Sequence, residues 1–305
     1  MHQADQSDTA FTPDHTRPDD ERGISDVVQG YNRPVLFYVL ATAWPWAFWF
    51  AAAYLSNLDN QTDLVRTGTA AFGLAGLIAP VLVVAWLVRN RPELRADIAA
   101  RLRWPRQVPW SILAATFLLL LASIELATAI SVLFGASPEQ FQFRGGWTFT
   151  AGVLPVWVTL IGAAILEELA WHGYGTDTLV RRMRVFSASM LFTVIWALWH
   201  LPLGFIKGYY HQEVVEQGFL QVLNFPLSMV AFVLLMNWLY FRGGRSILIP
   251  IVFHLTANLV NEIFLTDPDT KIIQTGLLLV VAAVVVWRDR ELFFTRPQHR
   301  DLSGA

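Results

Sequence analysis

The 305-residue sequence contains no cysteine and few charged residues, and both shortages narrow what the protein can be. Without cysteine the chain forms no disulfide, offers no thiol nucleophile and holds no zinc through thiolates. Charged residues make up 15% of the chain, against about 25% in soluble domains. Hydrophobic residues make up 54%. This composition predicts an integral membrane protein surrounded by a lipid bilayer.

Several motifs are missing as well. The sequence has no glycine-rich phosphate loop and no G-x-S-x-G elbow, so phosphoryl transfer and serine chemistry lack support. A formal charge of -2 with dispersed arginines excludes an obvious nucleic-acid partner. We find no internal repeat, which counts against the common transporter architectures.

The chain divides into four predicted segments. Residues 1–33 form an acidic disordered cytoplasmic tail, because seven acidic side chains face two arginines within the first 30 residues. The next apolar stretch begins too late and runs too long for a cleavable signal peptide. Three N-terminal spans occupy 34–146, a core of four spans occupies 147–265, and a last span with a cytoplasmic tail occupies 266–305.

Eight apolar stretches approach or exceed the ~20 residues that a membrane-spanning helix needs. We therefore predict an all-α polytopic bundle with spans at 34–55, 68–88, 108–134, 151–180, 186–205, 219–241, 247–265 and 272–287. The fourth span is overlong, and we expect it to tilt or break near Gly173 and Gly175.

Basic residues gather on alternate connections of this eight-span arrangement. Eighteen of the 22 fall on one side, in the loops at 89–106, 181–184 and 242–245 and in the two tails. The opposite loops hold only Arg66, Arg144, Lys207 and Lys271. Because cytoplasmic loops carry excess Lys and Arg, both termini are predicted to be cytoplasmic, in a multi-pass protein of a bacterial plasma membrane.

Ionisable and amide side chains inside the spans have a high free-energy cost in the bilayer, so they mark candidate functional positions. They are Glu125, Glu167, Glu168, His172, His200, Asn237, His254, Asn258, Asn261 and Glu262. At a rise of 1.5 Å per residue, Glu167, His200, His254 and Asn258 lie roughly 20, 21, 11 and 17 Å from the cytoplasmic ends of their helices. Given the uncertain helix ends, we expect these four to meet in one layer. The loop histidine His211 is expected to be solvated.

Such a cluster offers the chemistry of hydrolysis. A buried carboxylate such as Glu167 can act as a general base on water, and a facing histidine can hold the same water. His254 and Asn258, four residues apart on one helix face, could donate to a developing oxyanion. A zinc site is the second interpretation, with Glu167, His200 and His254 as ligands. The sequence leaves both open, and it indicates no other cofactor.

The chain resembles the CAAX protease and bacteriocin-processing family of intramembrane endopeptidases. That family carries E-E-x-x-x-R, F-x-x-x-H and H-x-x-x-N, in this order, on three transmembrane helices. The corresponding stretches here are Glu167-Glu168-Leu169-Ala170-Trp171-His172, Trp196-Ala197-Leu198-Trp199-His200 and His254-Leu255-Thr256-Ala257-Asn258. The resemblance covers about 147–265, and the ordered trio is more specific than any single motif.

The resemblance implies a role for each of these residues. Glu167 would activate water, His200 would position it, and His254 and Asn258 would stabilise the oxyanion. Glu168 would support the site through His172, which stands where the family has arginine. Histidine is shorter than arginine and titrates near neutral pH. The second departure, Trp196 in place of phenylalanine, keeps an aromatic wall.

We therefore predict a hydrolase that cleaves a membrane-associated protein or peptide, without specifying a CAAX terminus. Two alternatives stay open at this point. A proton- or metal-coupled transporter would also place Glu and His inside a membrane. A catalytically weakened relative that binds or protects a membrane partner would account for His172. Glu125, alone on its span, and Asn237, Asn261 and Glu262 are expected to be structural.

Overall fold

The computed structural model describes residues 29–103, 108–146 and 155–295, and every regular element within these ranges is helical. The predicted all-α polytopic fold is confirmed. Six stretches are long and apolar enough to cross a membrane. They are α2 (Pro34–Ser56), α3 (Asp63–Val88), α5 (Trp110–Leu133), α8 (Val185–Trp199) together with the 3-10 turn η3 (Leu201–Phe205), α10 (Phe219–Arg242) and α12 (Pro268–Arg288).

The other two predicted spans are shorter or interrupted. The helix α11 (Leu248–Ile263) has 16 residues and is apolar. The overlong fourth span is composed of α6 (Val156–Ala170), a π-helical turn η2 (Trp171–Gly175) and α7 (Thr176–Val180). The irregularity that we expected near Gly173 and Gly175 is therefore this π-turn, which inserts extra backbone into a continuing helix. The predicted residues 151–154 lie outside the described residues.

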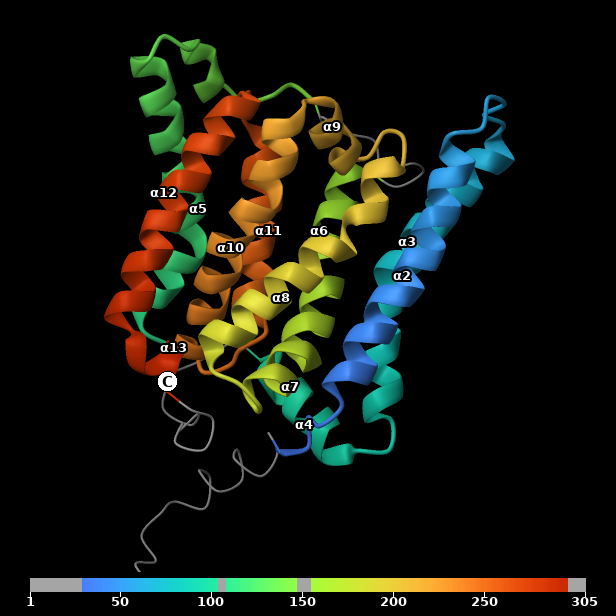
Figure 1. Cartoon of the computed structure of the whole chain (residues 1–305), viewed down its shortest axis with the longest axis vertical. Helices are drawn as coiled ribbons and strands as arrows, with labels where there is room; N and C mark the ends of the chain where they lie inside the picture. Colours follow the sequence, from blue (N-terminus) through green and yellow to red (C-terminus); the bar gives the residue numbers. More distant parts are fainter. Residues whose placement is uncertain (1–28, 104–107, 147–154, 296–305) are drawn as a thin grey trace, which may run out of the picture.

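The long helices run roughly alongside one another, and α2 with α3 forms a hairpin at one side of the bundle (Figure 1). On the other side α5 packs against α11 and α12, and α10 packs against α8 and α12. The interrupted helix α6 lies between the two groups, in contact with both α3 and α11. Its carboxylates are therefore surrounded by protein rather than lipid.

Short elements connect the spans or follow the last one, and none of them was predicted. They are α4 (Pro92–Arg101), the 3-10 turn η1 (Pro138–Phe141), α9 (Tyr210–Glu216) and α13 (Arg290–Phe294). The elements α4, α7 and α13 all lie at the end of the bundle where the arginine-rich connections gather (Figure 1). This is the end that the charge bias predicts to be cytoplasmic. The predicted tail at 1–33 falls mostly outside the described residues, but Tyr31 is fully buried.

Two tryptophans attach the α2–α3 hairpin to the rest of the bundle. The Trp49 indole N–H donates to the Gly73 carbonyl oxygen at 3.0 Å, and a Cβ at Gly76 would collide with the Trp49 ring. Trp49 packs edge-on against Trp199 at 4.5 Å between ring centroids. Trp199 in turn donates to the Ala41 carbonyl oxygen at 3.0 Å. These contacts fix the end of α8, where His200 lies, against α2.

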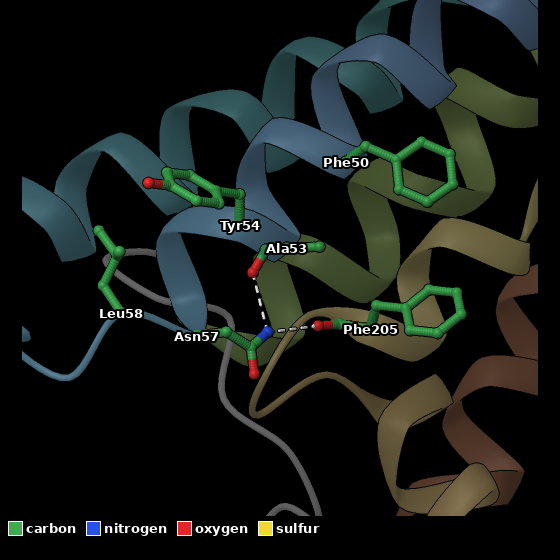
Figure 2. A pocket seen from close by; sticks show the side chains of 6 residues that line it. All are labelled: Phe50, Ala53, Tyr54, Asn57, Leu58 and Phe205. Carbon is green, nitrogen blue, oxygen red and sulfur yellow. Dashed lines mark hydrogen bonds between the residues drawn. The ribbon is translucent and has the colours of Figure 1, made fainter.

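A shallow apolar pocket lies where α2 ends beside η3 (Figure 2). It is lined by Phe50, Ala53, Tyr54, Asn57, Leu58 and Phe205. The Asn57 amide donates to the carbonyl oxygens of Ala53 at 2.8 Å and Phe205 at 2.9 Å, which ties the two elements together (Figure 2). None of the predicted site residues lines this pocket.

Candidate functional site

The two adjacent carboxylates occupy the last turn of α6, directly before the π-turn. Both side chains are buried: Glu168 is fully enclosed and Glu167 is 6% exposed. The π-turn lies where Phe37 and Tyr38 of α2 approach the backbone at Gly175 closely. A Cβ at Gly175 would lie 2.8 Å from a Phe37 ring carbon and 2.9 Å from the Tyr38 hydroxyl oxygen. Glycine is therefore required at this position for α2 to pack.

Glu167 lies against Trp196 of α8. The Trp196 indole N–H donates to a Glu167 carboxylate oxygen at 2.9 Å. The same indole ring contacts His200 at 5.4 Å and His254 at 5.5 Å between ring centroids. Trp196 thus lies at the centre of three predicted residues that come from α6, α8 and α11.

Glu168 is held by two histidines, one at each carboxylate oxygen. Nδ1 of His254 lies 2.8 Å from Oε1, and Nδ1 of His172 makes a short contact with Oε2. A fully buried carboxylate needs such partners, because an isolated charge in the interior is strongly unfavourable. Since its Nδ1 is used by Glu168, His254 has only Nε2 left for a substrate.

His200 ends α8, and its Nδ1 lies 2.6 Å from the Trp196 carbonyl oxygen. The expectation that His211 is solvated is wrong. His211 of α9 is half-buried and stacks on His200, with ring centroids 4.9 Å apart, and Phe225 contacts both rings. This packing removes water from His211, and the desolvation lowers its pKa to about 4. His211 is therefore neutral at physiological pH.

The remaining candidates lie at the edge of the site or outside it. The Asn258 amide donates to the Leu160 carbonyl oxygen at 3.2 Å, which joins α11 to α6. Glu125 on α5 is half-buried and makes no hydrogen bond or ion pair with a described residue. Asn261 accepts from Lys271 through its carbonyl oxygen at 3.4 Å, and Glu262 is buried.

The three residues suggested as zinc ligands keep few atoms for a metal ion. One Glu167 oxygen accepts from the Trp196 indole, and Nδ1 of His254 and of His200 face Glu168 and a backbone carbonyl oxygen, which leaves one Nε2 on each histidine. Within the described ranges no group of three or more His, Asp or Glu side chains is arranged to hold a metal ion. These described residues therefore do not fit a zinc site.

A second buried cluster lies beside the π-turn, and the sequence did not reveal it. The Arg101 guanidinium of α4 donates to the carbonyl oxygens of His172 at 2.9 Å and Gly173 at 3.0 Å, within the π-turn. It also pairs with the Asp177 carboxylate at 2.8 Å and donates to the Tyr240 hydroxyl at 2.6 Å. Arg245 pairs with the same carboxylate at 2.7 Å.

Arg101 therefore anchors the backbone that carries His172. Burial opposes its charge, but Tyr240 and the Asp177 carboxylate more than offset this, and the pKa of Arg101 is raised. From the sequence, Arg101 is one of the basic loop residues that set topology, and Asp177 inside the fourth span was not among the candidate residues. The signal available was Asp177 itself, an acid inside a predicted span that required a cationic partner.

Replacing Trp196 with phenylalanine tests its contact with Glu167. The aromatic wall is kept while the indole donor is lost, so we expect folding to persist. A hydrogen bond to a charged group contributes about 1.5–3 kcal/mol. Its loss should lower the initial rate of the expected peptide hydrolysis by about 10-fold or more. Trp157→Phe, at a surface position on α6 that is 54% exposed, is the control and should keep the full rate. Equal rates for both variants would contradict the role of the indole.

Comparison with known proteins places these residues within one matched region. A family model described as type II CAAX prenyl endopeptidase Rce1-like matches residues 147–260. Over 268 residues the chain is 35% identical to a protein named CAAX prenyl protease 2 from Methanococcus maripaludis. That alignment covers 87% of this chain and 97% of the relative. The region matched by the family model contains both carboxylates and all four of His172, His200, His254 and Asn258.

Proposed function

The chain belongs to the Rce1-like family of CAAX prenyl endopeptidases, and from this premise we propose that it cleaves prenylated CAAX termini with water activated by Glu167. Family membership makes the protein a multi-pass membrane protease and favours hydrolysis over the transporter interpretation. The observation that carries the proposal is the unequal environment of the two adjacent acids. Glu168 has a histidine on each oxygen, whereas Glu167 has the Trp196 donor and contacts the same aromatic group as His200.

In the proposed mechanism, Glu167 accepts a proton from a water molecule. The resulting hydroxide attacks the carbonyl carbon of the scissile peptide bond and forms a tetrahedral intermediate with a negatively charged oxygen. Glu167 then delivers the proton to the departing amine nitrogen as the C–N bond breaks. One water molecule is consumed, and a carboxylic acid and an amine are released, which ionise to a carboxylate and an ammonium group. No covalent bond forms between substrate and protein.

The other residues act on water and on the developing charge. Nδ1 of His200 is directed to the Trp196 carbonyl oxygen, which leaves Nε2 to hold the attacking water. His254, held at Nδ1 by Glu168, carries a hydrogen on each ring nitrogen in this mechanism and donates from Nε2 to the oxyanion. A donor fixed in advance stabilises such charge without reorganising during the reaction. Asn258 contributes by joining α11 to α6, so that His254 stays beside the carboxylates.

The substrate class follows from the name of the relative. A CAAX terminus is a C-terminal Cys-aliphatic-aliphatic-X sequence whose cysteine carries a farnesyl or geranylgeranyl chain. An enzyme within the bilayer can reach such an anchored peptide while its lipid stays in the membrane. We propose that the bond after the prenylated cysteine is cleaved, which releases the last three residues.

Purified full-length protein in lipid vesicles, incubated with a farnesylated peptide ending in a CAAX sequence, tests this proposal. We expect mass spectrometry to detect the released tripeptide, and much less of it from the same peptide without the farnesyl group. We also expect a zinc chelator to leave the rate unchanged, because the described residues hold no group of three ligands arranged for a metal ion. Cleavage of neither peptide would contradict the proposed substrate. A rate lost to chelator and restored by Zn²⁺ would contradict the metal-free mechanism.

A further inference from the structure

We infer that Asn237, a residue outside the recognised motifs, is a positioning residue that makes histidine functional at position 172. The inference rests on the proposed function, because it concerns how Glu168 is held beside Glu167. Nε2 of His172 lies 3.0 Å from Oδ1 of Asn237 on α10. His172 and Ser189 are fully buried and Asn237 is 1% exposed, so none of these polar groups has water as an alternative partner.

The orientation of the Asn237 amide is determined by Ser189 on α8. The Ser189 hydroxyl donates to the Val185 carbonyl oxygen at 2.8 Å, and its oxygen therefore accepts. Nδ2 of Asn237 donates to that oxygen at 2.8 Å. Since a side-chain amide has its donor on one side and its acceptor on the other, Oδ1 of Asn237 must face His172. The hydrogen-bond direction runs from His172 through Asn237 and Ser189 to the backbone.

This direction determines what His172 presents to Glu168. Nε2 faces an acceptor, so it carries a hydrogen, and Nδ1 faces the Glu168 carboxylate, so it donates as well. The ring is thereby fixed in one orientation between two acceptors. Tyr240 packs edge-on against it at 4.8 Å between ring centroids, which prevents the ring from tilting away.

The need for Asn237 follows from the shape of the imidazole ring. Arginine presents several N–H donors on one planar fork and can give two parallel bonds to a single carboxylate. The two imidazole nitrogens point in different directions, so only one can reach Glu168. The second nitrogen needs its own acceptor, because a buried donor left without a partner is costly. Asn237 provides that acceptor, and histidine at position 172 depends on it.

The test combines substitutions at positions 237 and 172 and uses the farnesylated CAAX peptide as substrate. In the natural background, Asn237→Leu should lower kcat about 10- to 100-fold, as expected for an unpartnered buried donor. KM should change less than about twofold, because Asn237 does not touch substrate. Asn237→Asp keeps an acceptor at the same place, and it should retain kcat within about fivefold. Ser189→Ala frees the amide to rotate and should give an intermediate loss.

The discriminating measurement uses a His172→Arg background. There the arginine fork gives two bonds to Glu168 that do not depend on Asn237, so Asn237→Leu should cause a clearly smaller loss of kcat than in the natural background. A purely structural asparagine would give the same loss in both backgrounds, and that result would overturn the inference. Thr193→Val is the matched control on α8, since the Thr193 hydroxyl donates only to the Ser189 carbonyl oxygen, at 2.9 Å. It should leave kcat unchanged.

Two further arms separate failure of this inference from failure of the proposed function. If the natural protein does not cleave the peptide, the proposed function fails. The same cycle is then read from thermal unfolding midpoints in detergent, where Asn237→Leu should destabilise the His172 protein more than the His172→Arg protein. If Asn237→Leu does not fold, Asn237→Asp and Ser189→Ala take its place. A Ser189→Ala variant with the same kcat and midpoint as the natural protein would also overturn the inference.

Discussion

The Glu167→Gln variant is expected to lose cleavage by about 10²- to 10⁴-fold, the range that a general base contributes. Glutamine has nearly the same shape as glutamate and can still accept the Trp196 N–H, so the protein should remain folded. It cannot take a proton from water. The loss should therefore fall on kcat, measured from initial rates of tripeptide release. His200→Ala is expected to show the same direction of effect, because the attacking water loses a partner.

The control for this substitution is Glu125→Gln on α5. Glu125 is likewise a glutamate within an apolar helix, half-buried where Glu167 is buried, and it contacts neither Trp196 nor the two histidines of Glu168. Its variant should cleave at the natural rate. Loss of a general base should lower the rate by at least about 100-fold. A Glu167→Gln protein that retained more than about a tenth of the natural rate would therefore contradict the role of Glu167. Another acid would then have to be sought.

Asp177→Asn is expected to give the largest loss of stability of any single substitution considered. The Asp177 carboxylate is fully buried between Arg101 and Arg245, at 2.8 and 2.7 Å. Removing its charge leaves two buried guanidinium groups with a single carboxylate, Asp97, which lies 2.9 Å from Arg101 and 3.4 Å from Arg245. Breaking a buried ion pair in this way costs about 3–5 kcal/mol. Because Arg101 also holds the carbonyl oxygens of the π-turn, activity should fall together with stability.

Thermal unfolding in detergent measures this effect, with Glu93→Gln as the control. Glu93 pairs with Arg91 at 3.1 Å on the surface of α4, where both side chains are 40% or more exposed. Exposed pairs contribute about 0–1 kcal/mol, so this variant should unfold close to the natural midpoint. Similar midpoints for the two variants would show that the cluster at Asp177 does not hold the π-turn in place.

Much of the fold was predictable because membrane helices are recognisable one at a time. Each span can be identified from a local run of apolar residues, and charge bias then orients the whole set. The same locality explains the errors at helix ends. The last span was predicted to begin at residue 272, whereas α12 begins at Pro268 with a polar first turn that hydropathy does not register.

The candidate site was predictable as far as local motifs reach. The residues Glu167, His200 and His254 could be singled out because each is polar within an apolar span. Their partners could not be identified in the same way. Asn237 is one polar residue on α10, and its relation to His172 depends on a contact between residues 65 positions apart. The stacking of His211 on His200 depends likewise on how α9 folds back after η3. Contacts of this kind require the tertiary structure.

The π-turn also changes the directions in which side chains before and after it point. In an uninterrupted α-helix, Glu168 and Asp177 would be nine residues apart and would point about 180° away from each other. With one residue absorbed by the bulge, the angle between them falls to about 80°. Both carboxylates can then turn inward, one to the two histidines and the other to the arginine pair. A single inserted residue thus lets one helix supply a carboxylate to two buried polar clusters. An ideal helix of the same composition would have turned one of these carboxylates towards lipid.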